Sequence, residues 1–196
     1  MRGYLIVVAL FYLGIGCNNV EKRTVDPMSE KAVFDISEYE IEEFGDGVQR
    51  ARKRFKDGSL VEEGMLLNGE RNGSWTIFHP NGKPHVVNSY LNGMKNGLTI
   101  EFDEFGRVRK EANFINDQFD GRYKEFVVYI PVRDTEYKNG KFHGLHKEFD
   151  HNGVLQKEMM FKEGVQHGPL NYYNSKGDVT VTYMYEDGEK ISGGMK

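Results

Sequence analysis

Cysteine is nearly absent from this 196-residue sequence, and its single copy, Cys17, excludes a disulfide within one chain. Proline is scarce, with five residues, and no apolar run reaches the roughly 20 residues that a helical membrane span needs. Neither sign of charge is in large excess, because 26 basic and 30 acidic residues leave a net charge of −4. This charge offers no general attraction to nucleic acid, so no nucleic-acid partner is expected.

The longest apolar run lies at the start of the sequence. Arg2 precedes apolar residues 5–13, and small glycines follow directly before Cys17, as is typical of a secretion signal. The arrangement resembles the lipobox of bacterial lipoproteins, although its leucine lies one residue further from the cysteine than usual. The resemblance implies that Cys17 is acylated, for example with palmitate, and anchors the protein in a membrane of the cell envelope. There are two alternatives. In one, the protein is secreted without a lipid and Cys17 is removed or left free; in the other, the apolar run forms a buried N-terminal strand.

Residues 1–16 are thus predicted to be a signal peptide and residues 17–28 a polar tether. Residues 29–49 are rich in Asp and Glu and precede a basic stretch at residues 50–56. We expect residues 29–49 to cap the open end of a sheet and to neutralise its first strand, because sheet edges need such cover. In an alternative interpretation, the basic stretch docks on anionic lipid head groups.

Glycine is abundant, with 23 residues, and most of it follows a period. One set recurs at intervals of 24, 24, 23 and 24 residues, a second set follows nine residues later, and one further glycine opens a half-repeat. These ten predicted turn glycines are Gly58, Gly73, Gly82, Gly97, Gly106, Gly121, Gly144, Gly153, Gly168 and Gly177. We predict a tandem repeat of about 24 residues over residues 50–192, followed by a tail at residues 193–196.

The segments between the glycines have the composition of β-strands. Residues 74–78 and 86–91 are rich in β-branched and aromatic residues and are bounded by Asn and Gly. Apolar residues alternate with polar ones, which puts one apolar face on an antiparallel sheet. We therefore predict an all-β fold, an elongated and mostly single-layered antiparallel meander in which each repeat is one hairpin and one link. Near Pro131 the turn glycine is missing, so a differently shaped turn is expected there.

Two recurring patterns resemble the bacterial variant form of the MORN repeat. An aromatic residue lies four positions before a turn glycine, as from Phe78 to Gly82, and a Y/F-x-x-G-x-x-x-G link recurs, as from Tyr90 to Gly97. The resemblance covers about 140 residues. It implies a repetitive β-meander used for protein or lipid contacts, with no catalytic residue in the motif. Some bacterial members are labelled antitoxin-like.

The sequence holds no pattern that predicts catalysis or metal binding. It lacks a nucleophile elbow, a phosphate-binding loop and the ligand spacing of a zinc site. Four histidines fall in the later repeats (His143, His146, His151 and His167), and we expect them to be solvated turn residues instead of metal ligands. Glu101, Glu125 and Glu148 recur four residues after repeat glycines and are predicted to form a solvated ladder. No enzyme activity, cofactor or metal is expected.

Aromatic residues that a single sheet cannot bury on both faces could form a contact surface. The candidates are Trp75, Tyr123, Tyr129, Tyr172 and Tyr173, and the alternative is that they pack as cross-strand pairs. The leading prediction is a membrane-anchored, non-enzymatic repeat scaffold that binds another protein in the cell envelope. A lipid- or glycan-contacting module and an antitoxin-like neutralising partner remain alternatives. The partner and the oligomeric state are not predicted.

Overall fold

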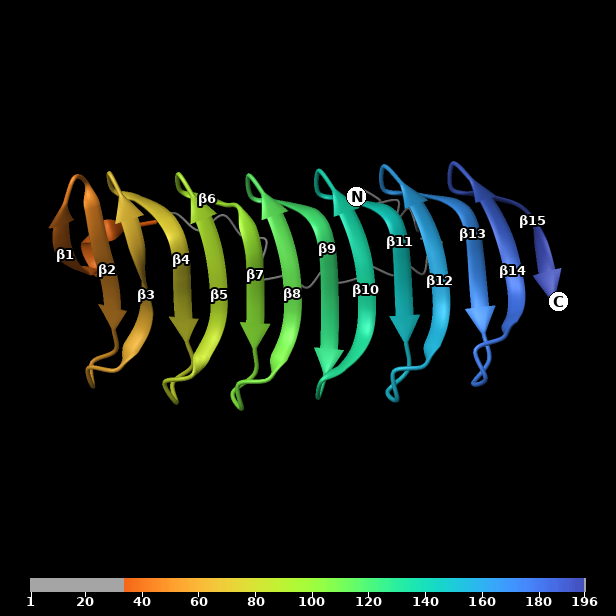
Figure 1. The fold of residues 1–196 in the computed structure, drawn as a ribbon, viewed down its shortest axis with the longest axis horizontal. Helices are drawn as coiled ribbons and strands as arrows, with labels where there is room; N and C mark the ends of the chain where they lie inside the picture. The colour runs from red at the N-terminus through yellow and green to blue at the C-terminus, as the bar shows by residue number, and fades with distance from the viewer. Residues whose placement is uncertain (1–33, 196) are drawn as a thin grey trace, which may run out of the picture. The chain divides into compact units, whose positions relative to one another are not determined.

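The computed structural model describes residues 34–195, which form one open antiparallel sheet (Figure 1). One 3₁₀ turn, η1 (Ile36–Glu38), precedes the sheet. The strands are β1 (Glu40–Gly45), β2 (Val48–Arg54), β3 (Leu60–Leu67), β4 (Glu70–Phe78), β5 (Pro84–Leu91), β6 (Met94–Lys95), β7 (Gly97–Phe102), β8 (Val108–Ile115), β9 (Gln118–Val127), β10 (Ile130–Lys138), β11 (Lys141–Phe149), β12 (Leu155–Lys162), β13 (Val165–Tyr173), β14 (Val179–Glu186) and β15 (Glu189–Met195). Among residues 34–195, no helix is long and apolar enough to cross a membrane.

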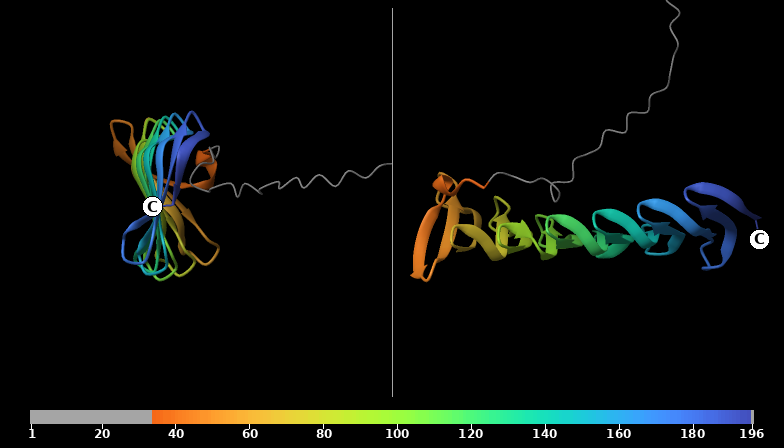
Figure 2. Two further views of the ribbon diagram at one scale, coloured as in Figure 1. Left: turned by 90° about the vertical axis from the view of Figure 1, so that its right-hand side faces the viewer. Right: turned by 90° about the horizontal axis from the view of Figure 1, so that it is seen from above.

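Strands that follow one another in the sequence are neighbours in the sheet, and the short β6 pairs with β5 beside this path. The path holds 14 strands, which at about 4.8 Å each give a sheet roughly 60 Å across its strands. Seen end-on, the strand ends fan out on either side of a narrow middle, as the twist between adjacent strands requires (Figure 2). The predicted elongated, single-layered antiparallel meander is confirmed.

Two kinds of turn alternate along the two long edges of the sheet. At one edge, the "Asn-Gly edge", two residues with positive φ connect strands, as at Asn68 (51°) and Gly69 (81°) between β3 and β4. At the other edge, five-residue turns such as residues 79–83 connect strands, and their glycines also have positive φ. Both kinds join adjacent antiparallel strands, so each repeat contributes two hairpins. The predicted link between hairpins is in fact the second hairpin turn.

All ten predicted turn glycines have positive φ, between 76° and 104°. Five of them lie in the five-residue turns, namely Gly58, Gly82, Gly106, Gly153 and Gly177. The other five lie inside strands, near the shift in register that follows each Asn-Gly turn, namely Gly73, Gly97, Gly121, Gly144 and Gly168. Gly73 and its four equivalents therefore lie at β-bulges instead of turns. A bulge of this kind favours glycine because its backbone is left-handed.

The sheet extends beyond the predicted repeat region at both ends. Within the segment expected to form a cap, Glu40–Gly45 is itself the edge strand β1, and β2 begins at Val48. Carboxylates of this segment pair with the basic residues of β2, for example Glu40 with Arg54 at 3.2 Å. Residues 193–195, expected to be a tail, belong to β15, where a side chain at Gly193 would collide with the backbone oxygen of Thr182.

The turn between β9 and β10 differs from the others, as the position of Pro131 predicts. It contains only Val128 and Tyr129, and both have positive φ, at 47° and 71°. Elsewhere among the described two-residue turns, these positions hold Asn, Asp, Glu or Gly. Val128 is β-branched, so its left-handed backbone is strained.

Candidate interaction surface

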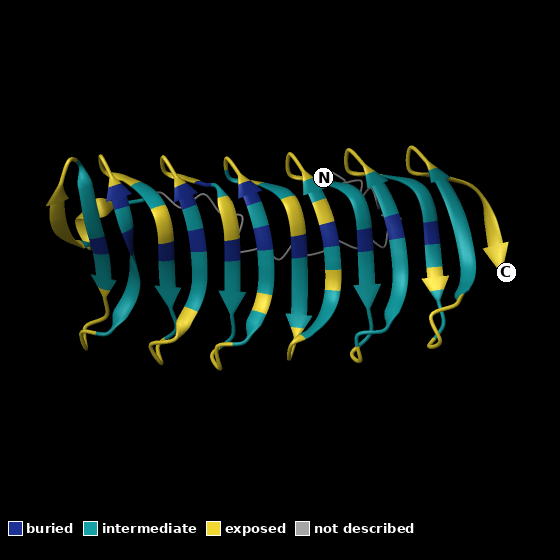
Figure 3. Cartoon of the chain, in the orientation of Figure 1, coloured by how far each residue is buried: buried dark blue, intermediate teal, exposed yellow. Residues whose placement is uncertain are grey.

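The two faces of the sheet have different compositions. We call the face that carries Trp75 face A and the face that carries Thr76 face B, since successive side chains in a strand point to opposite sides. A row of buried residues crosses the middle of face A from strand to strand (Figure 3). It comprises Ala51, Trp75, Asn88, Thr99, Ala112, Tyr123, Thr135, His146, Met159 and Leu170.

A second row on face A, nearer the Asn-Gly edge, is aromatic. Its members are Phe114, Phe119, Tyr137, Phe142 and Phe161, with neighbouring ring centroids 4.6 to 5.1 Å apart and ring planes tilted by 34–37°. Each ring lies against the next, so these faces are not open to a ligand. Such aromatic pairs contribute about 0.5–1.5 kcal/mol each beyond the area they bury. This row stabilises the sheet.

A third row on face A consists of ion pairs between adjacent strands. Glu101 contacts Lys110 at 3.3 Å, and Glu125 contacts Arg133 at 3.2 Å. Two of the carboxylates also reach the buried row: Tyr123 donates a hydrogen bond to Glu125 (2.5 Å), and His146 lies 3.1 Å from Glu148. The predicted solvated ladder of glutamates is therefore wrong, because these carboxylates are half-buried and paired.

The N-terminal end of face A is covered by the segment that precedes β1. Phe34 and Tyr39 pack edge-on against Trp75, with centroids 5.4 and 5.9 Å from its ring. The guanidinium of Arg71 lies 4.5 Å from the ring of Tyr90 and donates a hydrogen bond to its hydroxyl. Burial, together with the nearby Glu62 carboxylate, raises the pKa of Tyr39. This end of face A is closed by the chain itself.

The candidate contact aromatics therefore fall into two groups. Trp75 is 1% exposed and Tyr123 is 5% exposed, so neither is available for contact, and the alternative that they pack within the sheet holds for both. They are buried because each occupies the central row of face A. Tyr129 is 70% exposed at its turn and Tyr172 is 37% exposed, whereas Tyr173 is half-buried.

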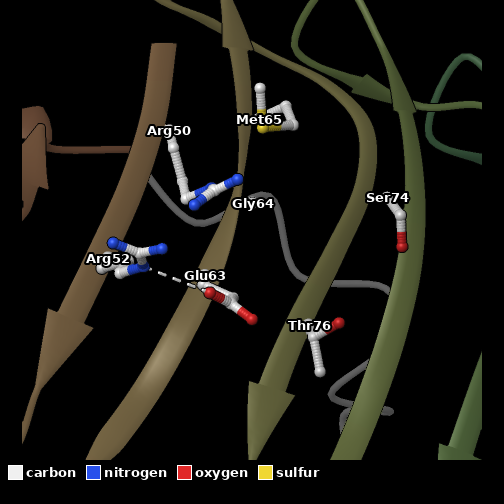
Figure 4. A pocket seen from close by; sticks show the side chains of 7 residues that line it. All are labelled: Arg50, Arg52, Glu63, Gly64, Met65, Ser74 and Thr76. Atoms are coloured by element: carbon white, nitrogen blue, oxygen red, sulfur yellow. Dashed lines mark hydrogen bonds and ion pairs between the residues drawn. The ribbon is translucent and has the colours of Figure 1, made fainter. Parts of the chain in front are cut away.

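Face B has a shallow cleft of about 450 Å³ over β2, β3 and β4 (Figure 4). It is lined by Arg50, Arg52, Glu63, Gly64, Met65, Ser74 and Thr76. Arg52 contacts Glu63 at 3.4 Å, and Glu42 on β1 lies 3.3 Å from Arg52 and 3.4 Å from Arg50. Two arginines thus face two carboxylates, which leaves the cleft close to electrical neutrality and makes it a weak site for a small anion.

Beside the cleft, exposed aliphatic side chains gather along the Asn-Gly edge of face B. We call this set the edge patch: Leu67, Leu91, Met94, Leu98 and Ile115. They are 37–50% exposed. Leu67, Leu91 and Ile115 each follow a buried face A residue directly, which places them on face B. No sequence-based expectation included the edge patch, because its members come into line only when the strands are paired.

The later histidines do not form a metal site. His143 lies 3.4 Å from Glu163 and His167 lies 3.5 Å from Asp187, each beside an Asn-Gly edge turn. His146 is buried, against the prediction of a solvated turn residue, and His151 is exposed. Within residues 34–195, no three His, Cys, Asp or Glu side chains are grouped so that they could hold a metal ion. The predicted signal peptide, the tether and Cys17 lie outside the described residues, so acylation of Cys17 stays a prediction.

Two parts of the chain match a known family. Residues 71–92 and residues 142–163 both match the family described as MORN repeat variant. The first match extends from β4 through the β4–β5 hairpin to the turn after β5, and the second covers the equivalent part of the β11–β12 hairpin. Together with the 24-residue period of hairpins, these matches show that the chain contains repeats of the MORN variant type.

Proposed function

We propose that this chain is a non-enzymatic repeat scaffold that binds another protein through face B and is held at a membrane of the cell envelope by a lipid on Cys17. MORN repeats are generally modules that contact proteins or membranes, and the repeat family is not catalytic. The observation that carries the proposal is the edge patch, because face A uses its side chains for packing and ion pairs while face B leaves the aliphatic side chains of the edge patch exposed.

A site-specific photocrosslinker on the full-length, membrane-bound protein tests the protein-binding part. Replacing Leu91 with the photoreactive residue p-benzoylphenylalanine should give a discrete adduct with one protein, identified by mass spectrometry. Glu186 is the matched control, because it occupies the position equivalent to Leu91 in the last repeat and is also exposed. Identical adducts from both positions, or none from Leu91, would refute binding through the edge patch.

The anchoring part is tested separately. Cys17→Ala should move the protein from the membrane fraction to the soluble fraction and abolish metabolic labelling with palmitate. A protein that remains in the membrane fraction, unlabelled, after this change would contradict a lipid anchor on Cys17. If the soluble Cys17→Ala variant still forms the adduct from position 91, binding of the partner protein is independent of the lipid anchor.

A further inference from the structure

The edge patch occupies positions at which the fold does not require apolar residues. Leu67, Leu91 and Ile115 are the last residues of β3, β5 and β8, directly before a two-residue turn. The equivalent positions in the next three hairpins are charged, with Lys138, Lys162 and Glu186 at the ends of β10, β12 and β14. Since the same backbone geometry accepts both classes of residue, packing within the sheet does not explain the three aliphatic side chains.

Two further members of the edge patch, Met94 and Leu98, lie beside these three residues. Met94 begins the strand after its turn, and the equivalent residues are polar at Glu70, Gln118, Lys141 and Glu189 but aliphatic at Val165, which is 42% exposed. Leu98 directly follows a bulge glycine, and the equivalent residues are Ser74, Arg122, Leu145 and Pro169, so this position does not distinguish the patch from the later repeats. Exposed apolar surface that the fold does not require indicates a binding surface. The contrast between repeats is thus carried by Leu67, Leu91 and Ile115, in the β3–β4, β5–β6 and β8–β9 hairpins of the Asn-Gly edge.

The spacing of the patch matches an α-helix laid across the strands. Leu67 and Leu91 are two strands apart, and Leu91 and Ile115 are again two strands apart. Two strand separations are about 9.6 Å, and seven residues of an α-helix rise about 10.5 Å. In an extended peptide, side chains on one face recur at about 6.7 Å, which does not match. Strands β3, β4, β5, β7 and β8 already have partners on both sides, so addition of a peptide strand to them is excluded.

Unpaired positive charge continues the line of the patch. Lys138 and Lys141 lie directly opposite each other across a turn, and Lys162 is on the next strand. No ion pair involves any of the three within the described part of the chain. Like charges opposite each other destabilise a sheet. Lys138 is two strands beyond Ile115, so it lies one further seven-residue step along the same line.

We propose that the edge patch, together with Lys138 and Lys141, binds one amphipathic helix of a partner protein. The helix has aliphatic residues at three successive seven-residue steps, which contact Leu67, Leu91 and Ile115. One step further it has acidic residues that contact Lys138 and Lys141. The four contact positions are separated by three steps of seven residues, so the contact spans about 22 residues of the helix. This inference rests on the proposed function and names the class of partner that face B accepts.

The test uses the full-length protein in detergent and a fluorescent 25-residue helical peptide. The peptide has leucines at three seven-residue steps and two glutamates at the fourth, and a second peptide has the same composition in scrambled order. Fluorescence anisotropy should show at least tenfold tighter binding of the patterned peptide. Leu91→Asp should weaken its binding at least tenfold, whereas Glu186→Gln, at the equivalent position, should leave it unchanged.

Charge reversal tests the lysines. Lys138→Glu with Lys141→Glu should weaken binding of the glutamate peptide and strengthen binding of a peptide with lysines at those two positions. Equal binding of patterned and scrambled peptides, or no effect of Leu91→Asp, would overturn the proposal. Binding of phosphatidylglycerol vesicles that depends on Leu91, without peptide binding, would also overturn it. The proposed function survives a failed peptide test if Leu91 still crosslinks to one protein, and falls if it does not.

Discussion

The turn between β9 and β10 holds two residues in a conformation that costs free energy. Val128 has φ of 47° and Tyr129 has φ of 71°, yet both side chains are mostly exposed, at 52% and 70%. A non-glycine residue held in the left-handed region costs about 1–3 kcal/mol, and a β-branched residue lies toward the upper end. Little apolar burial offsets this cost, so the turn is a place where the sequence conflicts with the fold.

Replacing the turn with Val128→Asn and Tyr129→Gly should therefore stabilise the protein. The glycine offsets about 0.5–1 kcal/mol of the relieved strain by making the unfolded chain more flexible. The expected net gain is about 1–2 kcal/mol in the free energy of unfolding, which raises the melting temperature by about 2–8 °C for a chain of this size. Thermal and urea denaturation followed by circular dichroism measure both quantities.

The reciprocal exchange provides the control. Asn139 and Gly140 form the two-residue turn between β10 and β11, with φ of 49° and 75°. A side chain at Gly140 would meet only ordinary contacts, so Asn139→Val with Gly140→Tyr introduces strain without a collision. This variant should lose about as much stability as the first gains. If the first exchange brings no gain, or the second no loss, the left-handed backbone is not the source of the strain.

Two further predictions concern face A. Gly64→Ala should cost about 1–3 kcal/mol in the free energy of unfolding, because its Cβ would lie 2.1 Å from a ring carbon of Trp75; Gly194→Ala, which meets no atom within 4 Å, should have a much smaller effect in the same urea titration. Burial lowers the pKa of His146 below its usual 6.5, although Glu148 opposes this shift. The unfolded chain therefore binds the proton first as the pH falls, so this residue reduces stability below about pH 6.5. His146→Gln should flatten the fall in melting temperature between pH 6.5 and pH 5, and an unchanged slope would contradict the assignment.

The fold could be predicted because its determinants are local and repeated. Asn and Gly at the turns, and glycine at each bulge, fix the positions at which the backbone must be left-handed. The alternation of apolar and polar residues then fixes which face is buried. What the period could not decide was whether Gly73 and its equivalents end a link or bend a strand, because glycine serves both purposes. The short distance from Asn68 to Gly73 hides a complete turn and the start of β4.

The candidate site was harder to predict because an aromatic residue in a single-layered sheet suits a contact surface and cross-strand packing equally well. In this sheet Trp75 and Tyr123 are the residues best able to fill the central row of face A, so size favours burial instead of exposure. The residues that face B exposes are ordinary aliphatics, and one such residue in isolation carries no information. Their meaning depends on register, which places three of them in line only after the strands are paired.

Repetition itself then separates structural positions from functional ones. A position that the fold requires is similar from repeat to repeat, as the bulge glycines from Gly73 to Gly168 are. A position that the fold leaves free can differ between repeats, and the Asn-Gly edge of face B changes from aliphatic, at Leu91, to basic, at Lys138, and then to acidic, at Glu186. At this position the classes follow an order along the sheet, with aliphatic residues at the ends of β3, β5 and β8 and lysines at the ends of β10 and β12. A partner that lies along several repeats at once would require that order, and a partner bound to a single turn would not.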